Sequence, residues 1–112
     1  MQASYAQSCT TVEVIQGDSV TIPYDMATDL TGYTAWFAAK KDLADAAYSI
    51  ALKEITASIT DVLNGRGTIP LTTAETNLAP GAYAAEVEIR KGAAVLTAMK
   101  FTLKIKGQVI AP

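Results

Sequence analysis

Apolar and polar residues alternate along most of this chain with a period of two, not with the 3.6-residue period of an α-helix. In "DSVTIPY", Val20, Ile22 and Tyr24 share one face of an extended chain, and the residues between them share the other. This pattern is typical of a strand with one buried face. Pro23 cannot donate a hydrogen bond to a neighbouring strand, so we expect its strand to lie at a sheet edge or to be bulged there.

Short alternating segments recur along the chain, and turn signals such as Gly17-Asp18 and Asn64-Gly65 separate them. Only "DLADAA", residues 42–47, indicates a short helical turn. We therefore predict an all-β fold, an antiparallel two-sheet β-sandwich of about seven to eight strands, immunoglobulin-like or fibronectin-III-like, with a barrel as the main alternative. The expected strands occupy residues 10–14, 18–24, 33–41, 48–52, 57–63, 67–71, 81–90 and 93–106.

The last two expected strands form a hairpin. Residues that pair across a hairpin point to the same side of the sheet, and the inner residues of both strands have odd numbers, so the connection must have odd length. A three-residue loop, Lys91 to Ala93, meets this condition and pairs Tyr83 with Phe101 and Ala85 with Met99. The inner residues of the second strand are then Val95, Thr97, Met99, Phe101, Leu103 and Ile105.

Trp36 and Phe37 are adjacent in "YTAWFAAKK", so their rings point to opposite faces of the expected strand. We expect Phe37 to face the core with Ala35 and Ala39, which leaves Trp36 outside among alanines, where an exposed tryptophan marks a protein interface. The opposite arrangement would make Trp36 the core tryptophan of the sandwich. In the next strand, "YSIAL", alternation groups three residues on one face, Tyr48, Ile50 and Leu52.

A threonine-rich stretch, "TTAETNLAPGAY", precedes the clearest strand and brings Pro80, Gly81 and Tyr83 together. Pro80 restricts φ and Gly81 adopts conformations that other residues resist, so we expect the chain to cross between the sheets here. Leu78 would close the end of the core, and the Tyr83 hydroxyl would bond back to the backbone of the crossing. This arrangement is a tyrosine corner, a feature of immunoglobulin-like sandwiches. An ordinary turn followed by an ordinary strand tyrosine is the alternative.

The length of 112 residues is that of one domain. We expect a single sandwich over residues 10–107, a flexible N-terminal segment over 1–9 and a C-terminal tail over 108–112. The net charge of −2, with dispersed Lys and Arg residues, argues against nucleic acid or an anionic membrane as partner. Residues 1–9 lack the basic and apolar regions of a signal peptide, so we expect synthesis in the cytoplasm.

Few residues of the chain offer chemistry. It has no histidine, which argues against Ser-His-acid and Cys-His catalysis and most zinc sites, and Cys9 is its one cysteine. We therefore predict that the protein is not an enzyme and has no catalytic, cofactor-binding or metal-binding residues. Five aspartates near loops match no calcium-binding spacing and are expected to be solvated, namely Asp25, Asp29, Asp42, Asp45 and Asp61.

Three stretches, in the order "VIQGDSVTIPY", "DLTGYTAWFAAKKD" and "LTTAETNLAPGAYAAEVEI", together resemble the small immunoglobulin-like domains of tailed-bacteriophage structural proteins. The resemblance covers the chain from Val12 to Ile105 through short motifs. It implies a phage or prophage virion component of the tail or baseplate. Its expected partners are other virion or tail and baseplate proteins, with a homo-oligomer as a further possibility.

Two functions from different classes are therefore expected. The first is a structural or assembly protein of the virion, made in the host bacterial cytoplasm, that acts through protein–protein contacts. The alternative is a ligand-binding or adhesin-like module that stacks a carbohydrate on Trp36 or Tyr33. In both cases Trp36 and Tyr33 are the candidate interaction surface.

Overall fold

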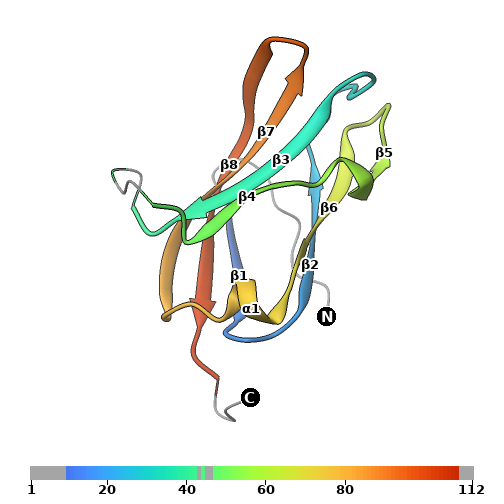
Figure 1. Cartoon of the computed structure of the whole chain (residues 1–112). Helices are drawn as coiled ribbons and strands as arrows, with labels where there is room; N and C mark the ends of the chain where they lie inside the picture. Colours follow the sequence, from blue (N-terminus) through green and yellow to red (C-terminus); the bar gives the residue numbers. More distant parts are fainter. Residues whose placement is uncertain (1–9, 43, 45–46, 109–112) are drawn as a thin grey trace.

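The computed structural model describes residues 10–42, 44 and 47–108. This part of the chain contains eight strands and two short helical segments, packed as a two-layer sandwich (Figure 1), so the predicted all-β sandwich is confirmed. The strands are β1 Thr11–Ile15, β2 Val20–Asp25, β3 Thr34–Lys40, β4 Ile50–Glu54, β5 Ile59–Asp61, β6 Arg66–Leu71, β7 Gly81–Lys91 and β8 Ala94–Lys106, and the helical segments are η1 Thr56–Ser58 and α1 Thr73–Thr76.

One sheet has five strands in the order β1-β8-β7-β3-β4, and the other has three in the order β2-β6-β5. In immunoglobulin-like domains strands C, F and G share one sheet and B, E and D the other, which matches β3, β7 and β8 against β2, β6 and β5. β4 joins the first sheet beside β3, as the C′ strand does in variable-type domains. Because the strands form two separate sheets, the barrel alternative is wrong.

The prediction of a purely antiparallel sandwich is wrong at one pair of strands. β1 runs parallel to β8, with Val12 beside Leu103 and Val14 beside Ile105, whereas the other ladders are antiparallel. Alternation does not reveal strand direction, because alternate residues share a face in either kind of pairing. The first strand of the chain therefore pairs with the last strand, β8, at the edge of the five-stranded sheet, and not with β2, its neighbour in sequence.

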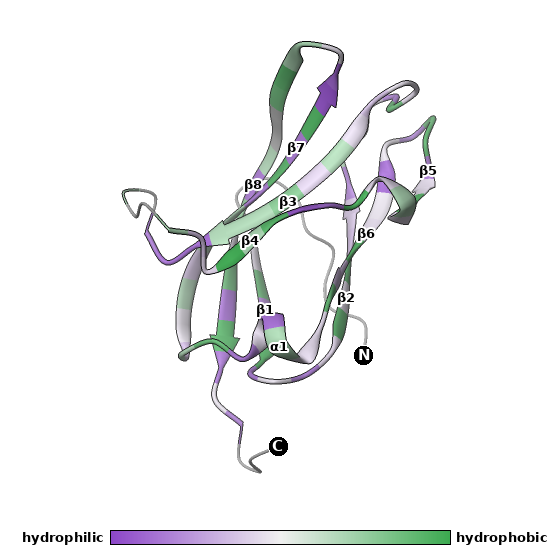
Figure 2. Ribbon diagram, in the orientation of Figure 1, coloured by the Kyte–Doolittle hydropathy of each residue, from purple (hydrophilic) through white to green (hydrophobic). Residues whose placement is uncertain are grey.

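The core lies between the inner faces of the two sheets, and the strands that enclose it carry alternating apolar and polar residues (Figure 2). On β2 the predicted inner residues Val20, Ile22 and Tyr24 are all buried. Phe37 on β3 is fully buried, and its ring packs against the ring of Phe101 with centroids 6.3 Å apart. β2 is an edge strand, as Pro23 predicts.

The register of the β7–β8 hairpin differs from the prediction. The turn has two residues, Gly92 and Ala93, and Gly92 adopts φ +59°, which suits a tight hairpin turn. With a two-residue turn, an odd-numbered inner residue of β7 would pair with an even-numbered outer residue of β8. A bulge in β8 opposite Val87 and Glu88 shifts the pairing by one residue, so that inner residues again pair with inner residues. Toward the base of the hairpin Tyr83 therefore pairs with Leu103 and Ala85 with Phe101, and beyond the bulge Val95 pairs with Arg90 and is exposed instead of facing the core.

The threonine-rich stretch crosses between the sheets through α1, which a capping box of Thr72 and Glu75 begins. Gly81 then opens β7 with φ +149°, a backbone conformation that glycine tolerates. The Tyr83 hydroxyl donates a hydrogen bond of 2.7 Å to the carbonyl oxygen of Ala79, while its ring is 5% exposed. This is the geometry of a tyrosine corner, and Leu78 packs against the core beside it.

Some predictions fall on residues outside the described part of the chain. These are the flexible segment 1–9 with Cys9, tail residues 109–112, and the helical turn at 42–47, which includes residues 43, 45 and 46. Gln108, which was assigned to the tail, is described, and its side-chain amide donates a hydrogen bond to the carbonyl oxygen of Gln16.

Candidate functional site

Trp36 lies on the outer face of the five-stranded sheet, on β3 between the edge strand β4 and the central strand β7. Its backbone neighbours across the sheet are Glu54 on one side and Glu88 on the other. The predicted orientation is confirmed, because Phe37 is fully buried and Trp36 is only half-buried on the opposite face.

The indole of Trp36 is held in place by two neighbours. Its Nε1 donates a hydrogen bond of 2.9 Å to the Thr34 hydroxyl. The guanidinium of Arg90 lies over the ring, 4.6 Å from the centroid, which gives a cation–π contact. Glu88 in turn accepts a hydrogen bond of 2.6 Å from Arg90 Nε, so the cation itself is fixed. A side chain held in this way loses little conformational entropy when a partner binds.

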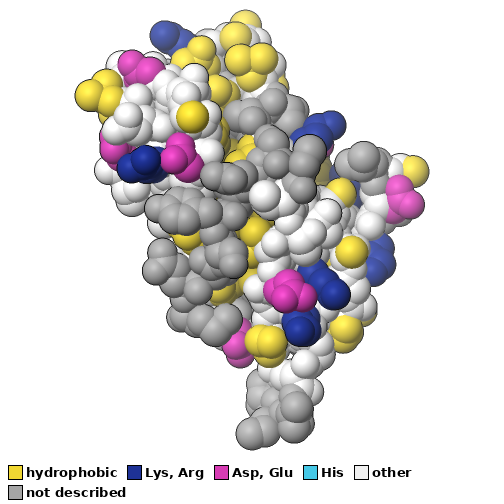
Figure 3. All heavy atoms as spheres, turned by 180° about the vertical axis from the view of Figure 1, so that it is seen from behind, with side chains coloured by type: hydrophobic (Ala, Val, Ile, Leu, Met, Phe, Trp, Pro, Cys, Tyr) yellow, Lys and Arg dark blue, Asp and Glu magenta, His cyan; other side chains and the backbone are white. Residues whose placement is uncertain are grey.

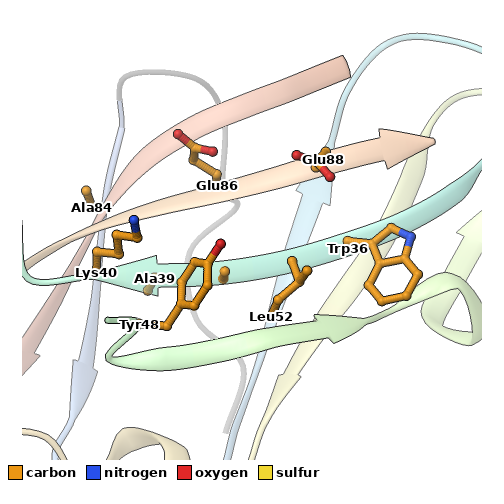
Figure 4. Close-up of a pocket in the computed structure, with 9 residues that line it drawn as sticks. Trp36, Ala39, Lys40, Tyr48, Leu52, Ala84, Glu86 and Glu88 are labelled. Atoms are coloured by element: carbon orange, nitrogen blue, oxygen red, sulfur yellow. The ribbon is translucent and has the colours of Figure 1, made fainter. Parts of the chain in front are cut away.

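A hollow with a volume of about 210 Å³ lies beside Trp36 on this face (Figure 4). Trp36, Tyr48 and Leu52 stand along one side of it, and Glu86 and Glu88 stand along the other. We call it the Trp36 hollow, and its lining residues are Trp36, Ala38, Ala39, Lys40, Tyr48, Leu52, Ala84, Glu86 and Glu88.

The hollow exists because small residues occupy the middle of the face. Ala38 on β3 and Ala84 on β7 point outward between larger neighbours, so no side chain fills the space above them. Its apolar side depends on Leu52 of β4 and on Tyr48, two residues before β4 begins, which are 40% and 52% exposed. Both are large apolar groups that the fold leaves in contact with water.

The expected grouping of Tyr48, Ile50 and Leu52 on one face is wrong. Ile50 is 2% exposed and lies in the core, whereas Tyr48 and Leu52 line the outer hollow. For Leu52 the cause is an irregularity in the β3–β4 ladder between Phe37 and Ala39, which shifts the register by one residue between Ile50 and Lys53, whereas Tyr48 lies before β4 and outside its alternation. Sequence reasoning therefore missed both residues as site candidates, and alternation within β4 held no signal for the shift.

Tyr33 does not join Trp36 in the hollow. It immediately precedes β3 and is half-buried, and the Lys91 amino group lies 5.3 Å from its ring centroid. Of the two aromatic residues expected at the interaction surface, the structure therefore places only Trp36 in a hollow, and it adds Tyr48 and Leu52.

The two carboxylates of the hollow differ in how closely a cation approaches them. Glu88 is bound tightly by Arg90, whereas the ion pair of Glu86 among the described residues is with Lys100, at a distance of 3.7 Å from Nζ to Oε1. That distance is longer than a hydrogen bond, and the Lys100 side chain is 64% exposed, so the pair contributes little. At the other end of the hollow the Lys40 amino group lies 5.0 Å from the ring centroid of Tyr48.

Other exposed apolar groups lie at the loop end of the sandwich. Val95 and Leu96, beside the β7–β8 turn, are 56% and 55% exposed, and Leu63 between β5 and β6 is 67% exposed. The view from behind shows hydrophobic side chains at this tip, with acidic and basic side chains interspersed elsewhere on that face (Figure 3). None of these three residues lines the Trp36 hollow.

A second hollow, of about 360 Å³, lies along β2 and β6 beside Lys53 and Pro70. Within the described part of the chain, no aromatic residue lines it, and its one charged lining residue is Lys53. The Lys53 amino group is already engaged, because it donates hydrogen bonds to the Pro70 carbonyl and to Glu75. This hollow therefore offers less chemistry than the Trp36 hollow despite its larger volume.

Asp45 lies outside the described residues, and the other four loop aspartates each accept a hydrogen bond from a backbone amide two or three residues further along the chain. Asp25 accepts a hydrogen bond of 2.8 Å from the Ala27 amide, and Asp29 accepts two from Thr31. The Ala27 amide, followed by Arg66, holds the pKa of the Asp25 carboxyl below its ordinary value. Among the described residues, no three His, Cys, Asp or Glu side chains gather into a group that could hold a metal ion. Likewise, no described helix is long and apolar enough to cross a membrane.

Comparison with known proteins identifies no family. No family model and no curated protein matches the chain. One solved structure that is similar is a cysteine protease inhibitor from Entamoeba histolytica, with 12% sequence identity, a TM-score of 0.40, and coverage of 92% of this chain and 96% of that chain. A likeness this weak has no bearing on function. What the strand order defines is the fold class, an immunoglobulin-like β-sandwich.

Proposed function

We propose that this protein is a non-enzymatic assembly component that binds another protein on the outer face of its five-stranded sheet. The observation that carries the proposal is the Trp36 hollow, in which a half-buried tryptophan held by Thr34 and Arg90 borders two exposed apolar side chains, Tyr48 and Leu52. Tryptophan is enriched among the residues that dominate binding energy at protein interfaces, especially beside a pocket that the partner fills.

The size of the hollow supports a protein partner over a free small molecule. Pockets for drug-sized ligands have volumes of roughly 300–1,000 Å³. The Trp36 hollow, at about 210 Å³, is smaller, and it lies open on a sheet face. A single side chain from a partner surface matches this scale, with the surrounding face supplying the rest of the contact.

We further propose that the partner is a component of a phage or prophage tail or baseplate, and that the protein resides in the virion. This step is supported by the three sequence stretches that resemble domains of such proteins. Two of them, "VIQGDSVTIPY" and "LTTAETNLAPGAYAAEVEI", form β2 and the corner before β7, and the third, "DLTGYTAWFAAKKD", contains Trp36.

The test is mass spectrometry of purified particles from the bacterium that carries the gene. We expect the wild-type chain in many copies per particle. We expect Trp36→Ala to lower its incorporation strongly, because a tryptophan hot spot of about 2 kcal/mol corresponds to about thirtyfold in affinity. The matched control is Leu63→Ala, which removes an exposed apolar side chain outside the hollow and should leave incorporation unchanged.

Absence of the wild-type chain from intact particles would refute the virion proposal. Equal loss in the Trp36 and Leu63 variants would show that the hollow is not the contact. Both variants must be shown to be folded before incorporation is measured, for which circular dichroism is sufficient.

A carbohydrate site is the second candidate, and one observation favours it. Trp36 and Tyr48 border the same hollow as the carboxylates of Glu86 and Glu88, which could accept hydrogen bonds from sugar hydroxyls. A glycan array separates the two functions, since a saturable signal that Trp36→Ala removes would support the carbohydrate site. A blank array, together with incorporation into particles, would favour the protein partner.

A further inference from the structure

The Trp36 hollow combines an apolar floor with the carboxylate of Glu86, whose one ion pair with a described residue is the loose contact to Lys100. The floor is formed by the methyl groups of Ala38 and Ala84, and Leu52 extends the apolar surface toward β4. Glu86 stands above this floor from β7, and Lys100 is 3.7 Å from its carboxylate. A side chain with a long apolar stem and a hydrogen-bond-donating head matches both features.

The chain itself already uses this chemistry at the same face. Arg90 lies 4.6 Å from the centroid of the Trp36 ring while donating to Glu88, so one guanidinium is held between an aromatic face and a carboxylate. Arg90 does not line the hollow, which leaves the hollow itself and Glu86 open to a second cation. Lys40 and Tyr48 lie at one end of the hollow and Trp36 lies at the other, with Glu86 on β7 between them (Figure 4), so the charge of Lys40 favours approach of an incoming cation to Glu86 from the Trp36 side.

We propose that the hollow receives one arginine side chain from the partner protein, an inference that rests on the proposed protein-binding function. The arginine stem lies on Ala38 and Ala84, and its guanidinium binds Glu86 in place of the loosely held Lys100. Arginine is favoured over lysine because its planar head binds a carboxylate through two parallel hydrogen bonds and stacks on an aromatic ring at the same time.

The experiment uses three short peptides as probes, added to the full chain labelled with ¹⁵N. They are Ac-Ala-Arg-Ala-NH₂, the same peptide with citrulline, which is a neutral mimic of arginine, and the same peptide with glutamate. Trp36 is the single tryptophan of the chain, so its indole N–H gives one assignable NMR signal beside the hollow. We expect the arginine peptide to move this signal saturably, and the citrulline and glutamate peptides to move it far less.

Two variants locate the contact. Glu86→Gln should weaken binding of the arginine peptide about tenfold, the effect of losing one charge-assisted hydrogen bond. Glu13→Gln is the matched control, because Glu13 is an exposed carboxylate of β1 that faces Lys104 and Lys106 at 3.8 and 3.9 Å and does not line the hollow. It should leave the arginine affinity unchanged.

The inference is overturned if the arginine peptide leaves the indole signal in place, if citrulline or glutamate binds as well, or if Glu86→Gln has no effect. A shift produced by an oligosaccharide instead would assign the hollow to carbohydrate. Particle incorporation that depends on Trp36 without arginine binding would leave the proposed function standing and remove only the arginine. Failure of both experiments would remove both proposals.

Discussion

Phe37 and Trp36 are neighbours on one strand, yet the two faces of that strand hold them in different ways. Phe37 is fully buried between the sheets and stacks near Phe101 from a distant part of the chain. Trp36 lies on the outer face and is held by Thr34, two residues before it, and by Arg90 on the adjacent strand β7. We therefore expect the inner face to determine the stability of the fold. The outer face presents a preformed surface, and substitution of its side chains should lower the stability only slightly.

The largest expected difference in stability is between substitutions of these two neighbouring residues. Phe37→Ala should lower the free energy of unfolding by about 3–5 kcal/mol, because it leaves a cavity in a closed core. Trp36→Ala should lower it by only about 1–2 kcal/mol, since it removes one cation–π contact and a half-buried ring outside the core. Urea denaturation of both variants measures the difference. Equal losses would mean that the outer face is part of the stabilising core.

Two buried tyrosines of the inner face should differ in how much their hydroxyl groups contribute to stability. Tyr83→Phe should lower the free energy of unfolding by about 1 kcal/mol, because the Ala79 carbonyl loses its hydrogen bond. Tyr24 is fully buried, burial raises its pKa to about 12, and no described residue bonds to its hydroxyl. Tyr24→Phe should therefore cost nothing or stabilise slightly. The reverse ranking in chemical denaturation would contradict the tyrosine corner.

The smallest expected effect concerns a salt bridge at the margin between the sheets. Burial raises the pKa of the Glu75 carboxyl, but hydrogen bonds from Thr72 and Lys53 outweigh it and hold the pKa below its ordinary value of 4.5. Because the folded-state pKa is depressed, this contribution to stability is present above pH 4.5 and is lost as the pH falls through the folded-state value.

The loss in the free energy of unfolding on acidification should be at most about 1 kcal/mol, since the side chains of Lys53 and Glu75 are partly exposed. It is measured as the difference in urea midpoint between pH 7 and pH 3, compared between the wild type and Glu75→Gln. The variant should show a smaller difference, and Glu13→Gln serves as the control for the change in net charge. An identical acid response in the wild type and Glu75→Gln would exclude the salt bridge as the cause.

Much of the inner face could be predicted from alternation alone. Val20, Ile22, Tyr24 and the orientation of Phe37 follow from their positions along β2 and β3, because side chains alternate strictly across a strand. The crossing before β7 was also visible, since Pro80, Gly81 and Tyr83 have conformational preferences that act within a few residues.

The predictions failed where one strand meets another. The turn at Gly92 was one residue shorter than expected, and a bulge in the β7–β8 ladder corrected the parity and left Val95 outside. The shift in the β3–β4 ladder likewise places Leu52 on the outer face, and Tyr48 lies before β4, where strand alternation does not apply. Bulges depend on the twist and spacing of paired strands, and the residues on one strand carry little information about them.

The sequence by itself determined the fold class and which face of each regular strand is buried, since both depend on side-chain period and on local backbone preference. Only the tertiary structure decided the parallel pairing of β1 with β8 and the assembly of the Trp36 hollow. The hollow requires residues from β3, β7 and the β4 region to meet across two ladders. Their meeting depends on register, which is settled by contacts between segments far apart in the chain.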